Sequence, residues 1–107
     1  MADRNLQVSE TMNAFQLETT DTAVLLRLHG EVTIEEARPL QVALRTALLR
    51  PRRLAIESGD LVRIDAAVLQ VLVAGVRAAS GCSVPDPSPA WLAALERYAL
   101  TEAFAPN

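Results

Sequence analysis

The chain has 107 residues, of which 50% are hydrophobic and 21% are charged, and this is the composition of one globular domain. Its net charge of −3 argues against a nucleic-acid-binding protein, which needs a basic face to meet phosphates. One cysteine and one histidine leave no internal disulfide, no cysteine-based zinc site and no multi-histidine metal site, so we expect no metal ion or other cofactor.

The N-terminal residues do not form the uninterrupted apolar stretch of a signal peptide. The longest apolar run, residues 66–79, is too short and too polar to span a bilayer, because Gln70 and Arg77 interrupt it. We therefore expect a cytoplasmic protein. Its first 13 residues are predicted to be a flexible segment, and residues 14–107 are predicted to be one folded domain.

The first half of this domain is predicted to be a hairpin followed by a helix. Residues 14–18 alternate apolar and polar side chains, and residues 23–28 form a denser apolar run that ends at His29-Gly30. Residues 33–36 (Thr-Ile-Glu-Glu) have the pattern of a capping box, which predicts the start of a helix. Pro39 inside this helix predicts a kink or a later start.

The second half is predicted to add two further strand–helix units. Residues 53–56 read as a short strand, and Ser58-Gly59-Asp60 as a turn. Asp65 is a candidate N-cap for a helix whose apolar residues recur at helical spacing. Residues 82–84 are long enough for only a stub of strand. Residues 88–89 (Ser-Pro) predict the start of a last helix, whose apolar face holds Trp91, Leu92, Leu95, Tyr98 and Ala99. The predicted fold class is therefore α/β, with a mixed sheet of about four strands in the order β-β-α-β-α-β-α.

Three motifs in this order resemble the STAS domain family. Residues 28–33 (Leu-His-Gly-Glu-Val-Thr) are similar to the exit from that family's second strand. Residues 56–69 are similar to its strand, loop and helix start, and residues 87–92 (Pro-Ser-Pro-Ala-Trp-Leu) to the start of its last helix. The family includes bacterial anti-sigma-factor antagonists and the small cytoplasmic STAS subunit of phospholipid-trafficking ABC transporters. The resemblance implies a STAS fold and a protein that works by binding another protein.

The chain departs from the family's pattern at the start of the helix that follows Asp65. In anti-sigma-factor antagonists a partner kinase phosphorylates a serine just after the aspartate, and transporter-type members often carry a threonine there. Ala66 and Ala67 occupy these positions, so no phosphorylation is expected at either residue. Val68 stands where the family usually has glycine.

The resemblance places the partner-binding surface at this helix start and at the loop before it. The predicted surface consists of Ser58, Gly59, Asp60, Asp65, Ala66, Ala67, Val68 and Gln70. This helix has more apolar residues than one buried face needs, which favours a docking patch; a helix packed between two neighbours shows the same pattern. The structural alternatives are that Asp65 is an ordinary N-cap and that residues 58–60 are a plain polar turn. A further hypothesis is that Ser58 replaces the missing phosphorylation site.

Other side chains are predicted to be structural rather than catalytic. Glu57, Asp60 and Asp65 provide carboxylates, but no nucleophile, ligand set or glycine-rich phosphate loop accompanies them. His29 is interpreted as a strand-end residue and Cys82 as a small buried one. Trp91 and Tyr98 share one helix face, which favours core packing. Arginines 50, 52 and 53 are interpreted as a solvated cluster, with an acidic partner or lipid headgroups as the alternative.

Two partners remain open at this point. The first is an anti-sigma factor or a sensor kinase of the ATP-binding type, bound without a phosphorylation switch at residues 66 and 67. The second is the ATPase of a phospholipid ABC transporter. Pairing with a second copy is a further alternative, because an uncovered apolar helix face allows it. An enzyme or a nucleotide binder is the hypothesis that these residues favour least.

Overall fold

The computed structural model describes residues 14–105, and the predicted flexible segment 1–13 lies outside the described residues. The elements are β1 (Phe15–Thr19), β2 (Ala23–Val32), α2 (Ile34–Ala47), β3 (Arg53–Ile64), α3 (Ala66–Ala78), β4 (Gly81–Ser83), α4 (Pro89–Arg97) and a 3₁₀ helix η1 (Thr101–Phe104). The predicted α/β class and element order are confirmed.

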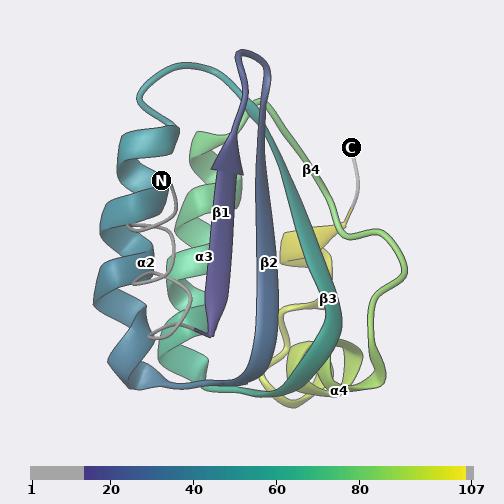
Figure 1. Ribbon diagram of the computed structural model, residues 1–107. Coiled ribbons are helices and arrows are strands. Elements are labelled where there is room, and N and C mark those ends of the chain that lie inside the picture. The colour runs from purple at the N-terminus through teal and green to yellow at the C-terminus, as the bar shows by residue number, and fades with distance from the viewer. Residues whose placement is uncertain (1–13, 106–107) are drawn as a thin grey trace.

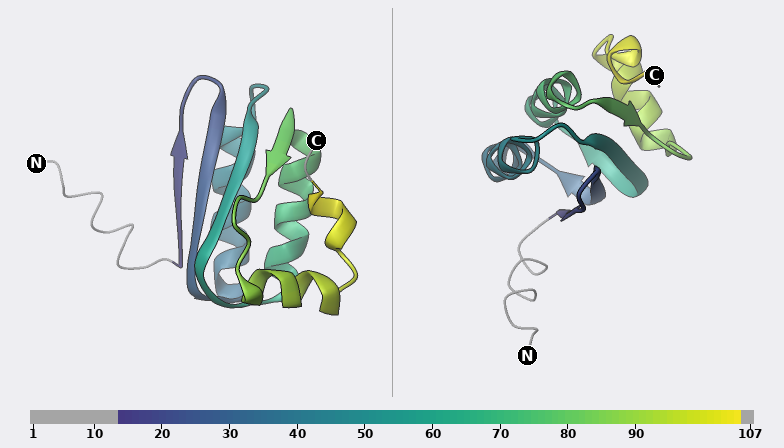
Figure 2. Two further views of the ribbon diagram at one scale, coloured as in Figure 1. Left: turned by 90° about the vertical axis from the view of Figure 1, so that its right-hand side faces the viewer. Right: turned by 90° about the horizontal axis from the view of Figure 1, so that it is seen from above.

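The sheet is mixed, with the strand order β1-β2-β3-β4. β1 is antiparallel to β2, whereas β2, β3 and β4 run parallel to one another. Helices α2 and α3 lie side by side over one face of the sheet (Figure 1). The short β4 pairs only with Arg53, Leu54 and Ala55 of β3, and α4 packs beside β3 at the other end of that strand (Figure 2).

β3 is longer than the sequence predicted, because residues 58–60 belong to the strand and do not form a turn. Asp60 is in register with His29 of β2, and Leu61 with Gly30, so both strands continue to the same edge of the sheet. Hydrogen bonding to a neighbouring strand overrides the local turn signal of Ser-Gly-Asp. The register shifts at Gly30, whose φ of 60° is accessible to glycine at little cost.

Helix α2 begins where the capping box predicts. The Thr33 Oγ1 accepts a hydrogen bond from the Glu35 amide (3.3 Å), and the Glu36 Oε1 accepts one from the Thr33 amide (2.8 Å). The helix continues through the exposed Pro39, which therefore does not delay its start. α4 begins as predicted at Pro89, with the Ser88 Oγ accepting from the Trp91 amide at 3.1 Å.

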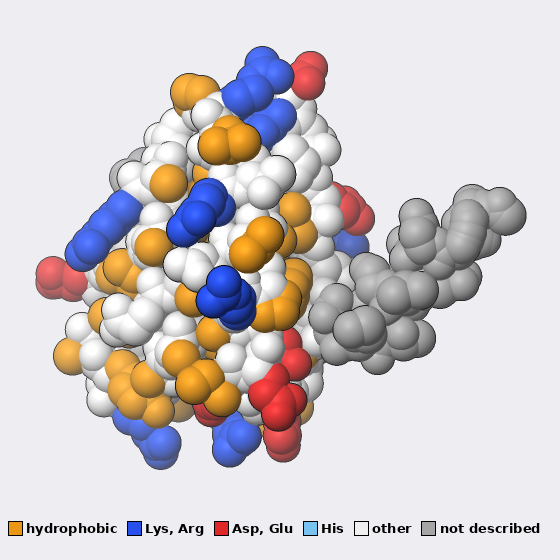
Figure 3. Space-filling view, turned by 90° about the vertical axis from the view of Figure 1, so that its left-hand side faces the viewer, with side chains coloured by type: hydrophobic (Ala, Val, Ile, Leu, Met, Phe, Trp, Pro, Cys, Tyr) orange, Lys and Arg blue, Asp and Glu red, His pale blue; other side chains and the backbone are white. Residues whose placement is uncertain are grey.

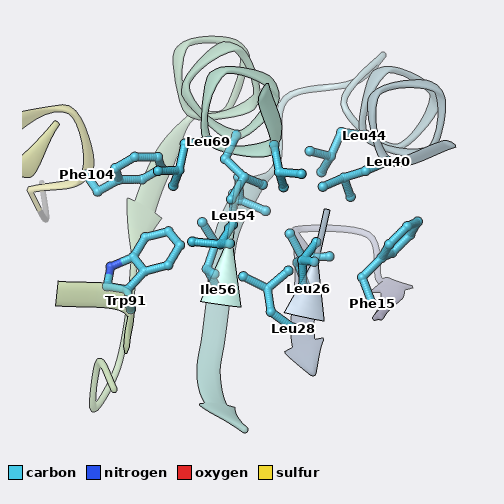
Figure 4. Packing of buried hydrophobic residues seen from close by; sticks show 14 of the residues in the cluster. Phe15, Leu26, Leu28, Leu40, Leu44, Leu54, Ile56, Leu69, Trp91 and Phe104 are labelled. Carbon is cyan, nitrogen blue, oxygen red and sulfur yellow. The ribbon is translucent and has the colours of Figure 1, made fainter. Parts of the chain in front are cut away.

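The core lies between the sheet and the helices (Figure 4). Leucines of the strands point toward leucines of α2 and α3, and at one end of this layer Trp91 meets Phe104 edge to face with ring centroids 5.0 Å apart. Helix α3 packs between α2 and η1, so Val68 is buried in addition to Leu69, Leu72 and Val73. The apolar excess of this helix thus reflects packing against two neighbours.

The prediction that Trp91 and Tyr98 both pack into the core is half correct. Trp91 is buried, whereas α4 ends at Arg97 and the Tyr98 side chain is 38% exposed. Seven residues of continuous helix would bring the two rings to one face, but Tyr98 is already the C-cap.

Candidate functional site

The parallel strands β2 and β3 end at the same edge of the sheet, and the helices α2 and α3 begin there (Figure 1). Asp65, between β3 and α3, connects the two strand–helix junctions. Its amide donates to the Val32 carbonyl (3.0 Å), and its Oδ2 accepts from the Ile34 amide (2.9 Å). The starts of both helices are therefore fixed relative to each other.

Asp65 does stand at the N-cap position of α3, but its side chain makes no hydrogen bond to that helix. The prediction of an ordinary N-cap is wrong in this respect, because the carboxylate caps the neighbouring helix α2 instead. Together with the capping box, this bond gives the first three amides of α2 an acceptor.

The start of α3 is more open than the start of α2. The Val68 and Leu69 amides both donate to the Asp65 carbonyl at 3.1 Å. Within residues 14–105, the amides of Ala66 and Ala67 have no acceptor. Both alanines are partly exposed, and methyl side chains leave space for another molecule to approach these two N–H groups.

The predicted surface residues divide into exposed and buried groups. Gly59, Asp60 and Gln70 are exposed, and Asp65, Ala66 and Ala67 are partly exposed. Ser58 and Val68 are fully buried, so their assignment to an exposed surface is corrected. Strand alternation turns Ser58 toward the core, and Val68 faces the layer between α3 and its neighbours.

Ser58 is a structural residue in this fold. Its Oγ accepts a hydrogen bond from the Ser88 amide (3.0 Å), and the Ser88 Oγ in turn accepts from the Trp91 amide. This chain of bonds joins the middle of β3 to the start of α4. With its hydroxyl fully buried, Ser58 does not fit the hypothesis of a substitute phosphorylation site.

Two exposed aliphatic side chains at this edge were not identified from the sequence. Ile34, the first residue of α2, is 66% exposed, and Val62, near the end of β3, is 67% exposed. Val62 also lines a hollow of about 280 Å³ between the end of β3 and α4, together with Arg63 and Tyr98. The available signal was the position of Ile34 directly after its capping residue, where the first helical turn projects away from the core.

The three candidate carboxylates do not converge on one point. The Glu57 Oε1 pairs with the Arg27 Nε at 2.9 Å, Asp65 caps α2, and the exposed Asp60 lies in β3. In the part of the chain that the structure describes, no three side chains of the metal-ligating types form a group able to hold a metal ion. The geometry therefore offers an open, partly apolar surface rather than a paired acid and base.

The histidine and the cysteine are both part of the sheet. His29 lies within β2, not at its end as predicted, and among residues 14–105 its buried Nε2 has no hydrogen-bond partner. Cys82 is buried in β4, as predicted, and this burial raises the pKa of the thiol, an effect that the nearby Arg53 charge partly offsets. None of the helices in the described part of the chain combines the length and apolar character needed to cross a membrane.

Comparison with known families identifies this arrangement. Residues 15–105 match a family model described as "Mlab, STAS domain". The chain belongs to the STAS domain family. The resemblance that the three sequence motifs indicated is therefore confirmed, and the match spans nearly all of the described residues.

Solved structures share the fold of this STAS domain. The anti-sigma factor antagonist SpoIIAA in its unphosphorylated form superimposes with a TM-score of 0.72 at 22% sequence identity, covering 83% of this chain and 84% of that one. The phosphorylated form of the Bacillus cell fate determinant SpoIIAA gives a TM-score of 0.66, also at 22% identity, over 83% of this chain and 86% of that one. A structure named Mglu matches with a TM-score of 0.57 at 25% identity, but over 71% of this chain and 20% of that one. No curated protein matches the chain.

Proposed function

We propose that this STAS domain is a non-catalytic module that binds another protein in the cytoplasm. The binding surface, here called the α3-start surface, consists of Ile34, Asp60, Val62, Ala66 and Ala67, with Gly59 and Gln70 at its margin. The observation that carries the proposal is the exposure of Ile34, whose amide is bonded to Asp65 at the start of α3, and of Val62, three residues before Asp65 in the chain. Large aliphatic side chains that are exposed to solvent at one edge of a small domain are typical of a docking site.

The chemistry of the α3-start surface supports a protein partner. The aliphatic side chains provide apolar area, and the Ala66 and Ala67 amides provide two donors for a carbonyl or carboxylate of the partner. Asp65 and the capping box hold the two helix starts in place, so little ordering is needed on binding.

The first candidate partner is a regulatory protein, either an anti-sigma factor or a kinase-like ATPase. The fold shared with the anti-sigma factor antagonist SpoIIAA supports this proposal. Residues 66 and 67 are alanines, and the Ser58 hydroxyl is buried, so none of these positions offers a kinase a hydroxyl whose phosphorylation would release the partner. We therefore propose a module that stays competent for binding when its partner is an active kinase.

The second candidate partner is the ATPase of a phospholipid-trafficking ABC transporter. The match to the family model described as "Mlab, STAS domain" and the Pro-Ser-Pro-Ala motif at residues 87–90 favour this alternative. Both candidates use the same surface, so the identity of the captured protein separates them.

The test is affinity capture with the tagged chain from its native cells, followed by mass spectrometry and by direct binding of the purified partner. Ile34→Glu and Val62→Glu are expected to reduce capture strongly, because each puts a charge into an apolar contact. Leu92→Glu, an exposed aliphatic residue on α4, is the matched control. An anti-sigma factor or kinase-like ATPase supports the first candidate, and an ABC-type ATPase supports the second. Partner binding that survives both substitutions in folded protein would refute the proposed surface.

A further inference from the structure

A second hollow lies on the far side of the helical layer from the sheet, between the C-terminal halves of α2 and α3. Its volume is about 280 Å³, and its lining includes Leu44, Leu48, Val71, Ala74 and Ala78. We call it the α2–α3 groove. Because α2 and α3 run in the same direction, the groove lies toward the opposite end of both helices from the α3-start surface (Figure 1).

The floor of the α2–α3 groove depends on Gly75. A Cβ atom built at this position would lie 3.2 Å from Leu44 Cδ1, so the absence of a side chain lets α2 approach α3 closely. The groove that remains above this contact is lined mainly by leucine, valine and alanine. Such a surface is shaped to receive apolar side chains from outside.

The charges around the α2–α3 groove all have one sign. Residues 37–56 and 66–85 contain six of the ten arginines of the chain and no aspartate or glutamate, although the whole chain has a net charge of −3. Arg45 lines the groove, and Arg38, Arg50 and Arg77 are exposed on the same two helices or just beyond them. Among residues 14–105, none of these four forms an ion pair with a carboxylate.

After its acidic first turn (Glu35 and Glu36), α2 carries an exposed stripe of cationic and apolar residues. Arg38, Val42 and Arg45 follow one another at i, i+4 and i+7, which places them on one stripe of the helix. Val42 is 54% exposed. The space-filling view of this side shows basic side chains set among hydrophobic ones over the middle of the face (Figure 3).

We propose that the α2–α3 groove binds an acidic amphipathic helix of a partner protein. An amphipathic helix lays its apolar stripe into a groove between two helices, and its flanking carboxylates then meet the arginines on the rim. Arginine is suited to this role because its planar guanidinium makes paired hydrogen bonds to a carboxylate. The complementary charge of the partner follows from the absence of any acidic residue on these segments.

The same observations disfavour two other occupants. A second copy docked through the same groove would place arginine against arginine across a twofold axis. A bilayer surface is flat and is met by protruding aromatic and leucine side chains. Leu49, which lines the groove, is 78% exposed, but the rest of the apolar lining forms a hollow, and residues 37–56 and 66–85 contain no aromatic residue. Trp91, Phe15 and Phe104 are buried, and Tyr98 lies at the end of α4.

The probe for this proposal is a synthetic 18-residue helical peptide with leucines on one stripe and glutamates beside it, titrated into the ¹⁵N-labelled full chain. Amide shifts are expected at Val42, Arg45, Val71 and Ala74. A matched peptide with glutamine in place of glutamate is expected to bind the chain roughly tenfold more weakly than the glutamate peptide does. The Arg45→Glu variant of the chain is expected to bind the glutamate peptide more weakly by a similar factor. Ala74→Glu, which puts a carboxylate into the groove, is expected to do the same. Leu92→Glu is the control and should bind as the unmodified chain does.

Several outcomes would overturn the proposal. Equal affinity for the two peptides would refute the argument from charge. Amide shifts outside the groove would show that the peptide binds elsewhere. Binding to phosphatidylglycerol vesicles but not to the peptide would assign the face to a membrane. A dimer that Arg45→Glu dissociates would assign it to a second copy, and peptide binding that appears only after deletion of residues 2–13 would assign it to the chain's own N-terminal segment. The Ile34→Glu and Val62→Glu variants should bind the peptide as the unmodified chain does. A chain that does not bind the peptide would therefore refute the groove proposal and leave the proposal for the α3-start surface standing.

Discussion

At the scale of single residues, Ser58 and Ser88 show how two buried hydroxyl groups position a helix. The Ser88 amide takes no part in the backbone hydrogen bonds of a sheet or helix. It donates instead to the buried Ser58 Oγ. The Ser88 hydroxyl then caps α4 through the Trp91 amide. A buried amide without an acceptor is costly, so this pair fixes where α4 begins relative to β3.

We predict that Ser58→Ala destabilises the fold by about 1–3 kcal/mol, because it leaves the Ser88 amide buried without a partner. The free energy of unfolding in urea measures this effect. Ser80→Ala, at an exposed serine just after α3, is the control and should change the free energy by less than about 0.5 kcal/mol. Equal effects of the two substitutions would contradict the role assigned to Ser58.

At the scale of secondary-structure elements, the junction of α2 and α3 is the feature that organises the site. Each helix follows a parallel strand, and the Asp65 carboxylate extends from the second junction to the first amide of the helix at the other. The consequence is asymmetric: the first amides of α2 all have acceptors, whereas the start of α3 has two open amides. The backbone donors that the proposed α3-start surface offers therefore lie at the start of α3 and not at the start of α2.

We predict that Asp65→Ala weakens the start of α2 more than that of α3. Loss of this cap is expected to cost about 0.5–2 kcal/mol. Amide hydrogen exchange at Ile34 should accelerate, because that amide loses its acceptor. Asp60→Ala, at an exposed aspartate of β3 whose carboxylate makes no hydrogen bond among residues 14–105, should leave the exchange at Ile34 unchanged. Faster exchange confined to α3 would show that Asp65 caps its own helix.

At the scale of the whole molecule, α4 and η1 complete a core that the sheet and the two parallel helices leave open. β4 pairs with only the first three residues of β3, and α4 packs beside the rest of that strand. Trp91 of α4 is buried and contacts Phe104 of η1, so the C-terminal segment is packed into the same hydrophobic cluster as α2 and α3. We therefore expect the described residues to unfold as one unit.

We predict that Trp91→Ala destabilises the fold by about 3–5 kcal/mol through the cavity it creates, a large share of a typical domain's stability of about 5–15 kcal/mol. Thermal unfolding followed by circular dichroism should show one transition at a much lower temperature. Leu92→Ala removes an exposed neighbour on the same helix and should have little effect. Two separate transitions in Trp91→Ala, with the first confined to the C-terminal segment, would disprove the single unit.

Local signals in the sequence predicted most of the secondary-structure elements and their order. The capping box at residues 33–36, the Ser-Pro start of α4 and the apolar stripes of the helices each act within a few residues, so their pattern in the chain predicted the element order and the α/β class. The three motifs, taken in order, indicated the STAS family. The stub of β4 followed from the few residues available before Pro85.

Only the tertiary structure decided the remaining features, because each depends on a contact between residues far apart in the chain. The length of β3 follows from its pairing with β2, and the Asp65 carboxylate meets an amide 31 residues away. Ser58 and Val68 looked like surface residues beside a turn and a helix start, but strand alternation and the neighbours of α3 bury them. The exposure of Ile34 and Val62, like the apolar groove between α2 and α3, exists only where separate elements meet and leave part of their surface uncovered.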